Sequence, residues 1–107
     1  MRPLLTAHFL KRMRERMPGV SPDEFAKGVL WAIEEGRTDI LKPMGRTVVK
    51  DTSKPHRRRR KNAKRRVAIK VVGRKWGFTV DGCEFVLVLR DGRFVGEMVF
   101  VTVIRVL

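Results

Sequence analysis

Residues 83–106 read CEFVLVLRDGRFVGEMVFVTVIRV, and this stretch decides the fold. It is rich in β-branched and aromatic side chains, which favour strands. The pair Asp91-Gly92 interrupts it, and Asp-Gly is typical of tight hairpin turns. We therefore expect strands over residues 83–90 and 94–106 that run antiparallel to each other.

From Met98 onward the second of these strands is apolar on both faces apart from Thr102 and Arg105, which is typical of a strand with neighbours on both sides. Strict alternation places Thr102 on the same face as Phe100 and Ile104, and Arg105 on the opposite face. We expect this strand to lie in the middle of a meander.

Three shorter segments upstream are also strand candidates: residues 46–50 (RTVVK), 67–72 (VAIKVV) and 77–80 (GFTV). A glycine at position 73 and an Asp-Gly pair at 81–82 separate the later ones, as turn residues do. Together with the C-terminal pair, these segments predict an antiparallel sheet of four or five strands.

The first third of the chain has helical periodicity instead. Apolar residues recur every four positions over residues 4–17, and Pro18 with Gly19 ends that pattern. An S-x-x-E capping box at residues 21–24 begins a second helix, which we expect to end at Gly36. The sequence thus predicts a single α+β domain over residues 1–107, with two N-terminal helices packed on the sheet.

Residues 56–66 read HRRRRKNAKRR, so eight of eleven positions are Lys or Arg. The whole chain has 25 Lys and Arg against 11 Asp and Glu, a net charge of +14. A block of this kind repels itself unless an anion neutralises it, and nucleic acid is the commonest polyanionic partner. We expect a basic loop or arm at about residues 52–66; the alternative is a solvated loop without a ligand. Its candidate contacts are His56, Arg57, Arg58, Arg59, Arg60, Lys61, Lys64, Arg65 and Arg66.

Several classes of protein are disfavoured by the composition. The single cysteine, Cys83, excludes an intramolecular disulfide and a Cys-rich zinc site, and a reducing cytoplasm suits it. Residues 1–13 are interrupted by charge in a way that secretory signals are not, and no window has the apolar length of a membrane span. We find no phosphate-binding glycine loop and no metal-ligand spacing, so neither a cofactor nor a metal is expected.

His8, Arg12 and Arg16 are spaced by four and so share one strip of the first expected helix. Histidine is the usual general acid or base near neutral pH, and arginine holds phosphates bidentately. These roles suit metal-independent RNA cleavage, in which the 2′-hydroxyl is the nucleophile. The alternative is an ordinary basic helix that faces solvent. Thr102 is a further candidate for phosphate contact, or else a normal strand residue.

Two tryptophans differ in their surroundings. Trp76 follows Arg74 and Lys75 in an expected turn, where it could stack on an unpaired base or instead cap the edge of the sheet. We count these three residues among the candidate nucleic-acid contacts. Trp31 lies in the second helix among apolar neighbours and is expected to pack in the core.

The helix with His8, Arg12 and Arg16, together with the terminal VTVIRV at residues 101–106, resembles the RelE-like and wider barnase, EndoU and colicin type superfamily of small ribonucleases. The resemblance implies helices against a four- or five-stranded antiparallel sheet, and a toxin-type endoribonuclease that needs no metal. It further implies that His8 is the acid or base and that both arginines contact the scissile phosphate, with Thr102 beside them.

The sequence therefore predicts a small basic nucleic-acid-binding protein and leaves its activity open. One alternative is a metal-independent endoribonuclease of the toxin type, a second is a non-catalytic DNA- or RNA-binding protein of phage or bacterial origin, and a third is an inhibitor that docks on an acidic protein surface. RNA is favoured over DNA through the resemblance, and an acidic antidote is a conceivable protein partner. The oligomeric state is not predicted.

Overall fold

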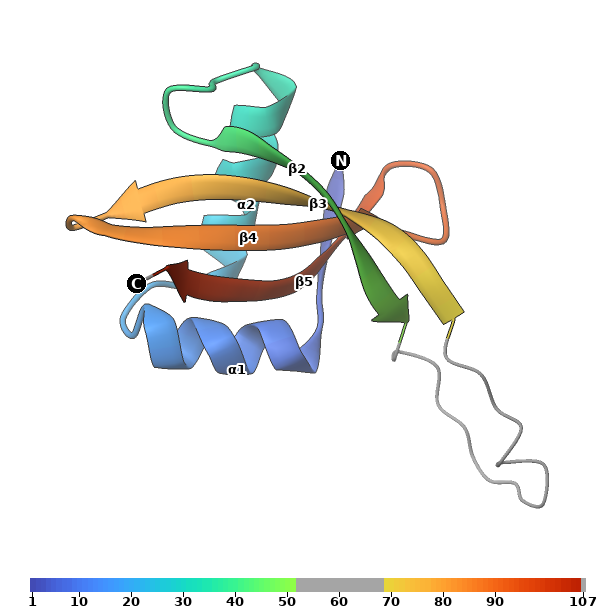
Figure 1. Cartoon of the computed structure of the whole chain (residues 1–107), viewed down its shortest axis with the longest axis horizontal. Helices are drawn as coiled ribbons and strands as arrows, with labels where there is room; N and C mark the ends of the chain where they lie inside the picture. The colour runs from blue at the N-terminus through green and yellow to red at the C-terminus, as the bar shows by residue number, and fades with distance from the viewer. Residues whose placement is uncertain (52–68, 107) are drawn as a thin grey trace.

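The computed structural model describes residues 1–51 and 69–106, without the side chains of residues 50, 51 and 69–71. Within these ranges the chain forms two helices and a five-stranded sheet, which confirms the α+β class with its N-terminal helical pair (Figure 1). The elements in chain order are β1 (Arg2–Leu5), α1 (Ala7–Arg16), α2 (Pro22–Glu34), β2 (Lys42–Asp51), β3 (Ile69–Val80), β4 (Cys83–Asp91) and β5 (Glu97–Val106).

The strand order in the sheet is β1-β5-β4-β3-β2. All neighbouring strands are antiparallel except β1 and β5, which are parallel. Strand β5 does have neighbours on both sides, as expected, but the middle strand is β4. Strand β1 was not predicted, because residues 4–17 have helical spacing; the helix begins only at Ala7, after Thr6 caps it. Four residues are too few to carry a strand pattern of their own.

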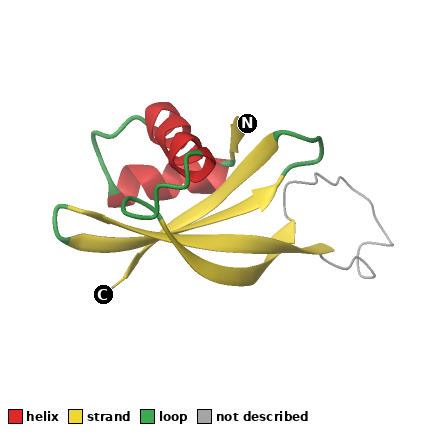
Figure 2. Ribbon diagram, turned by 90° about the horizontal axis from the view of Figure 1, so that it is seen from above, coloured by secondary structure: helices red, strands yellow, loops and turns green. Residues whose placement is uncertain are grey.

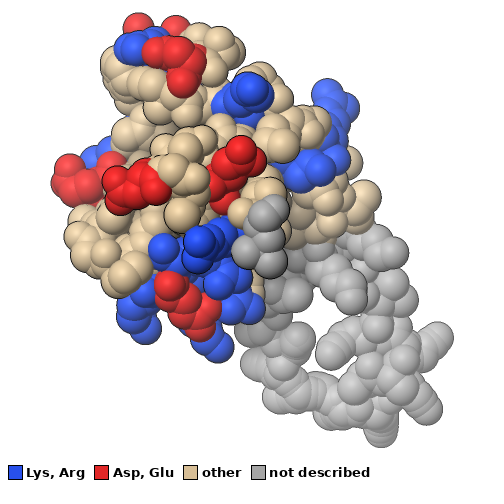
Figure 3. Space-filling view, turned by 60° about the vertical axis from the view of Figure 1, so that its left-hand side comes forward, with Lys and Arg blue, Asp and Glu red and all other residues tan. Residues whose placement is uncertain are grey.

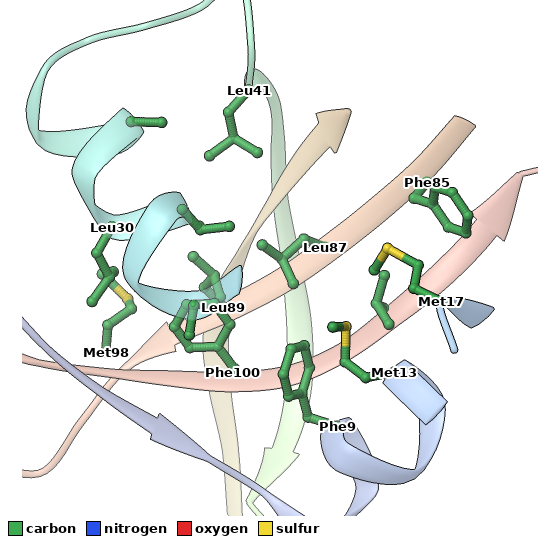
Figure 4. Close-up of a cluster of buried hydrophobic side chains, with 14 residues drawn as sticks. Phe9, Met13, Met17, Leu30, Leu41, Phe85, Leu87, Leu89, Met98 and Phe100 are labelled. Carbon is green, nitrogen blue, oxygen red and sulfur yellow. The ribbon is translucent and has the colours of Figure 1, made fainter. Parts of the chain in front are cut away.

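Both helices cover the same face of the sheet (Figure 2). Phe9 and Met13 of α1 are fully buried there, with Phe100 and Val103 of β5. Figure 4 shows Phe9, Met13 and Phe100 together with Leu87 and Leu89 of β4 between the helices and the sheet. The rings of Phe9 and Phe100 meet edge to face, with centroids 5.3 Å apart, a geometry that aromatic pairs prefer. The core therefore lies between the helices and one sheet face, and no helix of the described residues lies over the other face.

Trp31 is not in the core, contrary to expectation. Its side chain is 48% exposed and lies under the Arg37 guanidinium, 5.4 Å from the ring centroid. Helix α2 buries Ala26, Val29 and Leu30, and a residue one step of about 100° beyond Leu30 points away from that stripe. Apolar neighbours in sequence were misleading because they lie on a different side of the helix.

Strand β3 runs without a break through Gly73, so residues 67–72 and 77–80 do not form two strands. A Cβ at Gly73 would lie 2.8 Å from Cγ2 of Val49 and 3.0 Å from the carbonyl oxygen of Leu89. The glycine is there because neighbouring strands approach closely, and it does not mark a turn.

The two Asp-Gly pairs have different outcomes. Asp81 and Gly82 have φ of 50° and 78° between the paired residues Val80 and Cys83, which confirms a two-residue hairpin turn. Asp91-Gly92 is not such a turn. Strand β5 begins at Glu97, three residues later than expected, after a loop over residues 92–96. Glu97 closes that loop by accepting a hydrogen bond from the Gly92 N–H.

Strand β5 contains a bulge at Val101. Phe100 pairs with Leu89 and Thr102 pairs with Val88, so two residues of β5 advance against one of β4. The bulge shifts the alternation by one position. Phe100 and Val103 both enter the core, three residues apart rather than two or four.

In the described part of the chain no helix is long and apolar enough to cross a membrane.

Candidate nucleic-acid interface

Strands β2 and β3 extend past the rest of the sheet as a two-stranded ribbon, which we define as residues 48–51 and 69–72. The two strands pair from Val48↔Val72 to Asp51↔Ile69, whereas the last pair between β3 and β4 is Gly73↔Arg90. Figure 1 shows the ends of β2 and β3 projecting beyond β4 and β5. Among the described residues, these four residues of each strand thus pair only with each other.

Residues of like charge are register partners in this hairpin. Arg46 is paired with Arg74 at the base of the ribbon, and Lys50 with Lys70 within it. Like charges directly opposite each other destabilise an antiparallel pair. Asp91 compensates part of this, because Arg74 donates a hydrogen bond from Nη2 to its carboxylate at 2.9 Å. The hairpin therefore carries positive charges that repel each other, and a bound anion would reduce this repulsion.

The basic block continues from the ribbon in sequence but lies outside the described residues. Its nine predicted contacts are His56, Arg57, Arg58, Arg59, Arg60, Lys61, Lys64, Arg65 and Arg66. The connection it belongs to, residues 52–68, joins the paired ends Asp51 and Ile69. In the chain it is thus part of the connection between β2 and β3.

Helix α1 carries a second group of basic side chains on its outer side. His8 is exposed, Arg14 and Arg16 lie in the last turn, and Arg12 is half-buried. In Figure 3 basic side chains gather at the bottom of the view, over α1, with an acidic group among them. The predicted strip of His8, Arg12 and Arg16 therefore exists on the surface of α1.

Two members of this strip are restrained by contacts with the protein. Arg12 donates a hydrogen bond from Nη1 to Glu15 at 2.6 Å, and this bond lowers the pKa of the Glu15 carboxyl. Nε of Arg16 is buried and has no hydrogen-bond partner in the described part of the chain. Arg16 therefore lies partly against the protein.

Thr102 is not brought to this strip. The predicted alternation with Phe100 is wrong, because the bulge at Val101 pairs Thr102 with Val88. Leu87 and Leu89, the neighbours of Val88, belong to the core under the helices, so Val88 and Thr102 point to the opposite face. Helix α1 packs on the face of Phe100. The sheet thus separates Thr102 from His8, Arg12 and Arg16.

Trp76 and its basic neighbours lie within β3 and not in a turn. Trp76 pairs with Leu87 and packs against the core, so its ring is not presented to an unpaired base. Arg74 is exposed on the same face as Trp76, and Lys75 is on the other. These three residues therefore do not form one binding surface.

A hollow of about 590 Å³ lies where the α2–β2 connection meets β3 and β4. Its lining includes the carboxylates Asp39 and Glu84 against one base, Lys42. Asp39 is in turn bound by Arg37, whose Nη2 is 2.9 Å from its carboxylate. The charge of this hollow does not suit a phosphate.

Comparisons with protein-family models, curated proteins and solved structures gave no match. Among the described residues there is also no group of three or more histidine, cysteine, aspartate or glutamate side chains placed to hold a metal ion.

The ribbon is the feature that sequence reasoning missed. The glycine at position 73 divided β3, so its first half was not read as an extension of a longer strand. A signal was nevertheless present, since TVVK before the basic block and VVGRK after it both contain adjacent β-branched residues, which favour strands. Two such segments around a polar stretch are the pattern of a long hairpin.

Proposed function

We propose that this protein binds nucleic acid through its phosphates, with the β2–β3 hairpin as the main contact. The observation that carries the proposal is the projection of this hairpin, with Arg46 opposite Arg74 and Lys50 opposite Lys70, into a connection that contains the basic block. Each Lys or Arg side chain that contacts a phosphate releases a counterion, so affinity depends steeply on salt concentration.

The test compares two variants of equal charge. The first double variant, Arg57→Gln/Arg58→Gln, removes two positive charges from the basic block. The second, Lys27→Gln/Arg93→Gln, removes two exposed positive charges elsewhere. Binding of a labelled oligonucleotide is measured over a range of salt concentrations. The block variant is expected to lose about 0.9 in the slope of log K against log salt for each lost contact with a duplex, or about 0.7 with a single strand. Equal slopes in the two variants would remove the block from the interface.

A second candidate function is metal-independent cleavage of RNA. It is favoured by the exposure of His8 on α1 with Arg12 one turn away, in a fold of the class that the ribonuclease resemblance implies. In this proposal His8 moves the proton of the 2′-hydroxyl or of the leaving group, and Arg12 contacts the phosphate. Thr102 has no part in it, since it is on the other face of the sheet.

Cleavage is tested with labelled RNA in the presence of EDTA. Products with 2′,3′-cyclic phosphate ends are expected, and His8→Ala is expected to abolish them while leaving RNA binding unchanged. Lys11→Ala, an exposed change on the same helix, is the control. RNA that stays intact at high protein concentration would exclude this activity and leave the binding proposal as it is.

A further inference from the structure

The ribbon exposes an apolar pair that a protein surface normally covers. Val48 and Val72 are 64% and 61% exposed and are directly opposite each other. Val48 is two residues from Arg46, and Val72 is two residues from Arg74. Residues at this spacing lie on the same face of a strand, so all four share one face. Trp76 continues that face along β3 and packs against the core. The helices cover this face in the body of the sheet, whereas neither described helix covers it in the ribbon.

We propose that this face of the ribbon enters the major groove of a double-stranded DNA. The inference rests on the proposed function and names its substrate class and mode of binding. Arg46 and Arg74 at the base would meet the phosphates at the groove edge. Val48 and Val72 would meet base edges, where a thymine methyl group is a matching apolar partner.

The dimensions of the ribbon fit this groove. Two paired strands are about 4.8 Å apart, and four residues reach about 13 Å beyond the sheet. The major groove of B-form DNA is about 12 Å wide and 8.5 Å deep, and it admits a two-stranded ribbon. The major groove of an A-form RNA duplex is too narrow for side chains to read. Geometry therefore favours DNA for this element.

Other partners match the ribbon less well. A single strand is bound through stacking on exposed aromatic rings, whereas the described side chains here are the valines of the ribbon and the arginines at its base. In a dimer formed through this face, Arg46 and Arg74 of one copy would lie near Arg46 and Arg74 of the other copy, and these like charges would repel each other. The alternation of apolar and basic pairs suits a groove with apolar base edges and anionic walls.

The experiment measures affinity for a duplex DNA, a duplex RNA of the same sequence and each single strand, at one low salt concentration. Duplex DNA is expected to bind tightest. Arg46→Gln is expected to weaken duplex DNA binding at least about fivefold, with little effect on single strands. Lys27→Gln on α2 loses the same charge as a control. Thermal unfolding checks that Arg46→Gln stays folded, and its exposure predicts that it does.

Methylation by dimethyl sulfate at saturating protein identifies the groove. Protection of guanine N7, which lies in the major groove, is expected, and adenine N3 in the minor groove should stay reactive. Protection of N3 alone, or equal affinity for duplex and single strand, would overturn the inference and leave general binding in place. Failure to bind any of the nucleic acids at low salt would instead overturn the proposed function itself.

Discussion

Thr6 joins three parts of the molecule through one side chain. Its Oγ1 accepts a hydrogen bond from the Phe9 N–H at 3.0 Å and so caps α1. The same hydroxyl shares its proton between the carbonyls of Phe100 and Val101, at 3.1 and 3.2 Å. The Phe100 carbonyl also accepts from the Thr6 backbone N–H at 3.4 Å, so the hydroxyl is an additional donor to the carbonyls at the bulge.

Thr6→Val keeps the shape of the side chain but removes all of these bonds. We expect it to lower the free energy of unfolding by about 1–2 kcal/mol, because the cap is lost and the carbonyls of the bulge lose the hydroxyl as a donor. Thr6→Ser keeps the hydroxyl and should lose clearly less. Urea unfolding followed by circular dichroism measures both. Equal losses in the two variants would assign the effect to the methyl group and not to the hydroxyl.

Glu15 competes with a phosphate for the guanidinium of Arg12. The hydrogen bond from Arg12 lowers the pKa of Glu15, so the pair is intact above the ordinary pKa of a glutamate and is lost as pH falls through the lowered value. We expect Glu15→Gln to release Arg12 and to tighten nucleic-acid binding about two- to fivefold at low salt. Glu84→Gln, an exposed change on β4 with the same gain of charge, is the control. An equal gain in both variants would mean that net charge alone is responsible.

At the scale of the element, two glycines have opposite surroundings. Gly73 is enclosed within the sheet by Val49 and the backbone of Leu89, whereas a Cβ at Gly28 on α2 would meet nothing within 4 Å. Glycine in an open helix position is unfavourable, because its backbone loses more freedom on folding than that of alanine. The first glycine is required by packing and the second is not.

Gly73→Ala is therefore expected to destabilise the protein by about 1–3 kcal/mol, since strands must move apart to admit the methyl group. Gly28→Ala is expected to stabilise it by about 0.5–1 kcal/mol. Chemical unfolding gives both values. A neutral Gly73→Ala would show that β2 can shift away from β3, and the projecting ribbon would then be less firmly held than its pairing implies.

For the whole molecule, the net charge of +14 opposes folding through self-repulsion, and a bound polyanion should relieve it. A ligand at 100 times its Kd stabilises the folded state by about 2.7 kcal/mol, on the order of 10 °C in Tm for a domain of this size. We expect duplex DNA to raise Tm by this amount at low salt and not at high salt. Differential scanning fluorimetry measures the shift. A rise that persists in high salt would contradict phosphate contacts as its source.

Much of the fold follows from local pattern. The second helix begins at its capping box, with Ser21 accepting from the Glu24 N–H, and the turn at Asp81-Gly82 has the expected left-handed backbone. Such features depend on residues within a few positions of each other. The candidate site was predictable only in part: the strip on α1 exists, but Thr102 and Trp76 point elsewhere.

Sequence by itself determined the fold class, the helical pair, most of the strands and the excess of positive charge, because propensity, capping and charge are properties of short segments. Tertiary structure alone decided that β1 joins β5, that the bulge at Val101 turns Thr102 away from α1, and that β2 and β3 outrun β4 as a ribbon. These are matters of register between segments far apart in the chain. One residue of slip exchanges the two faces of a strand, and no local pattern records which register the packing of the core selects.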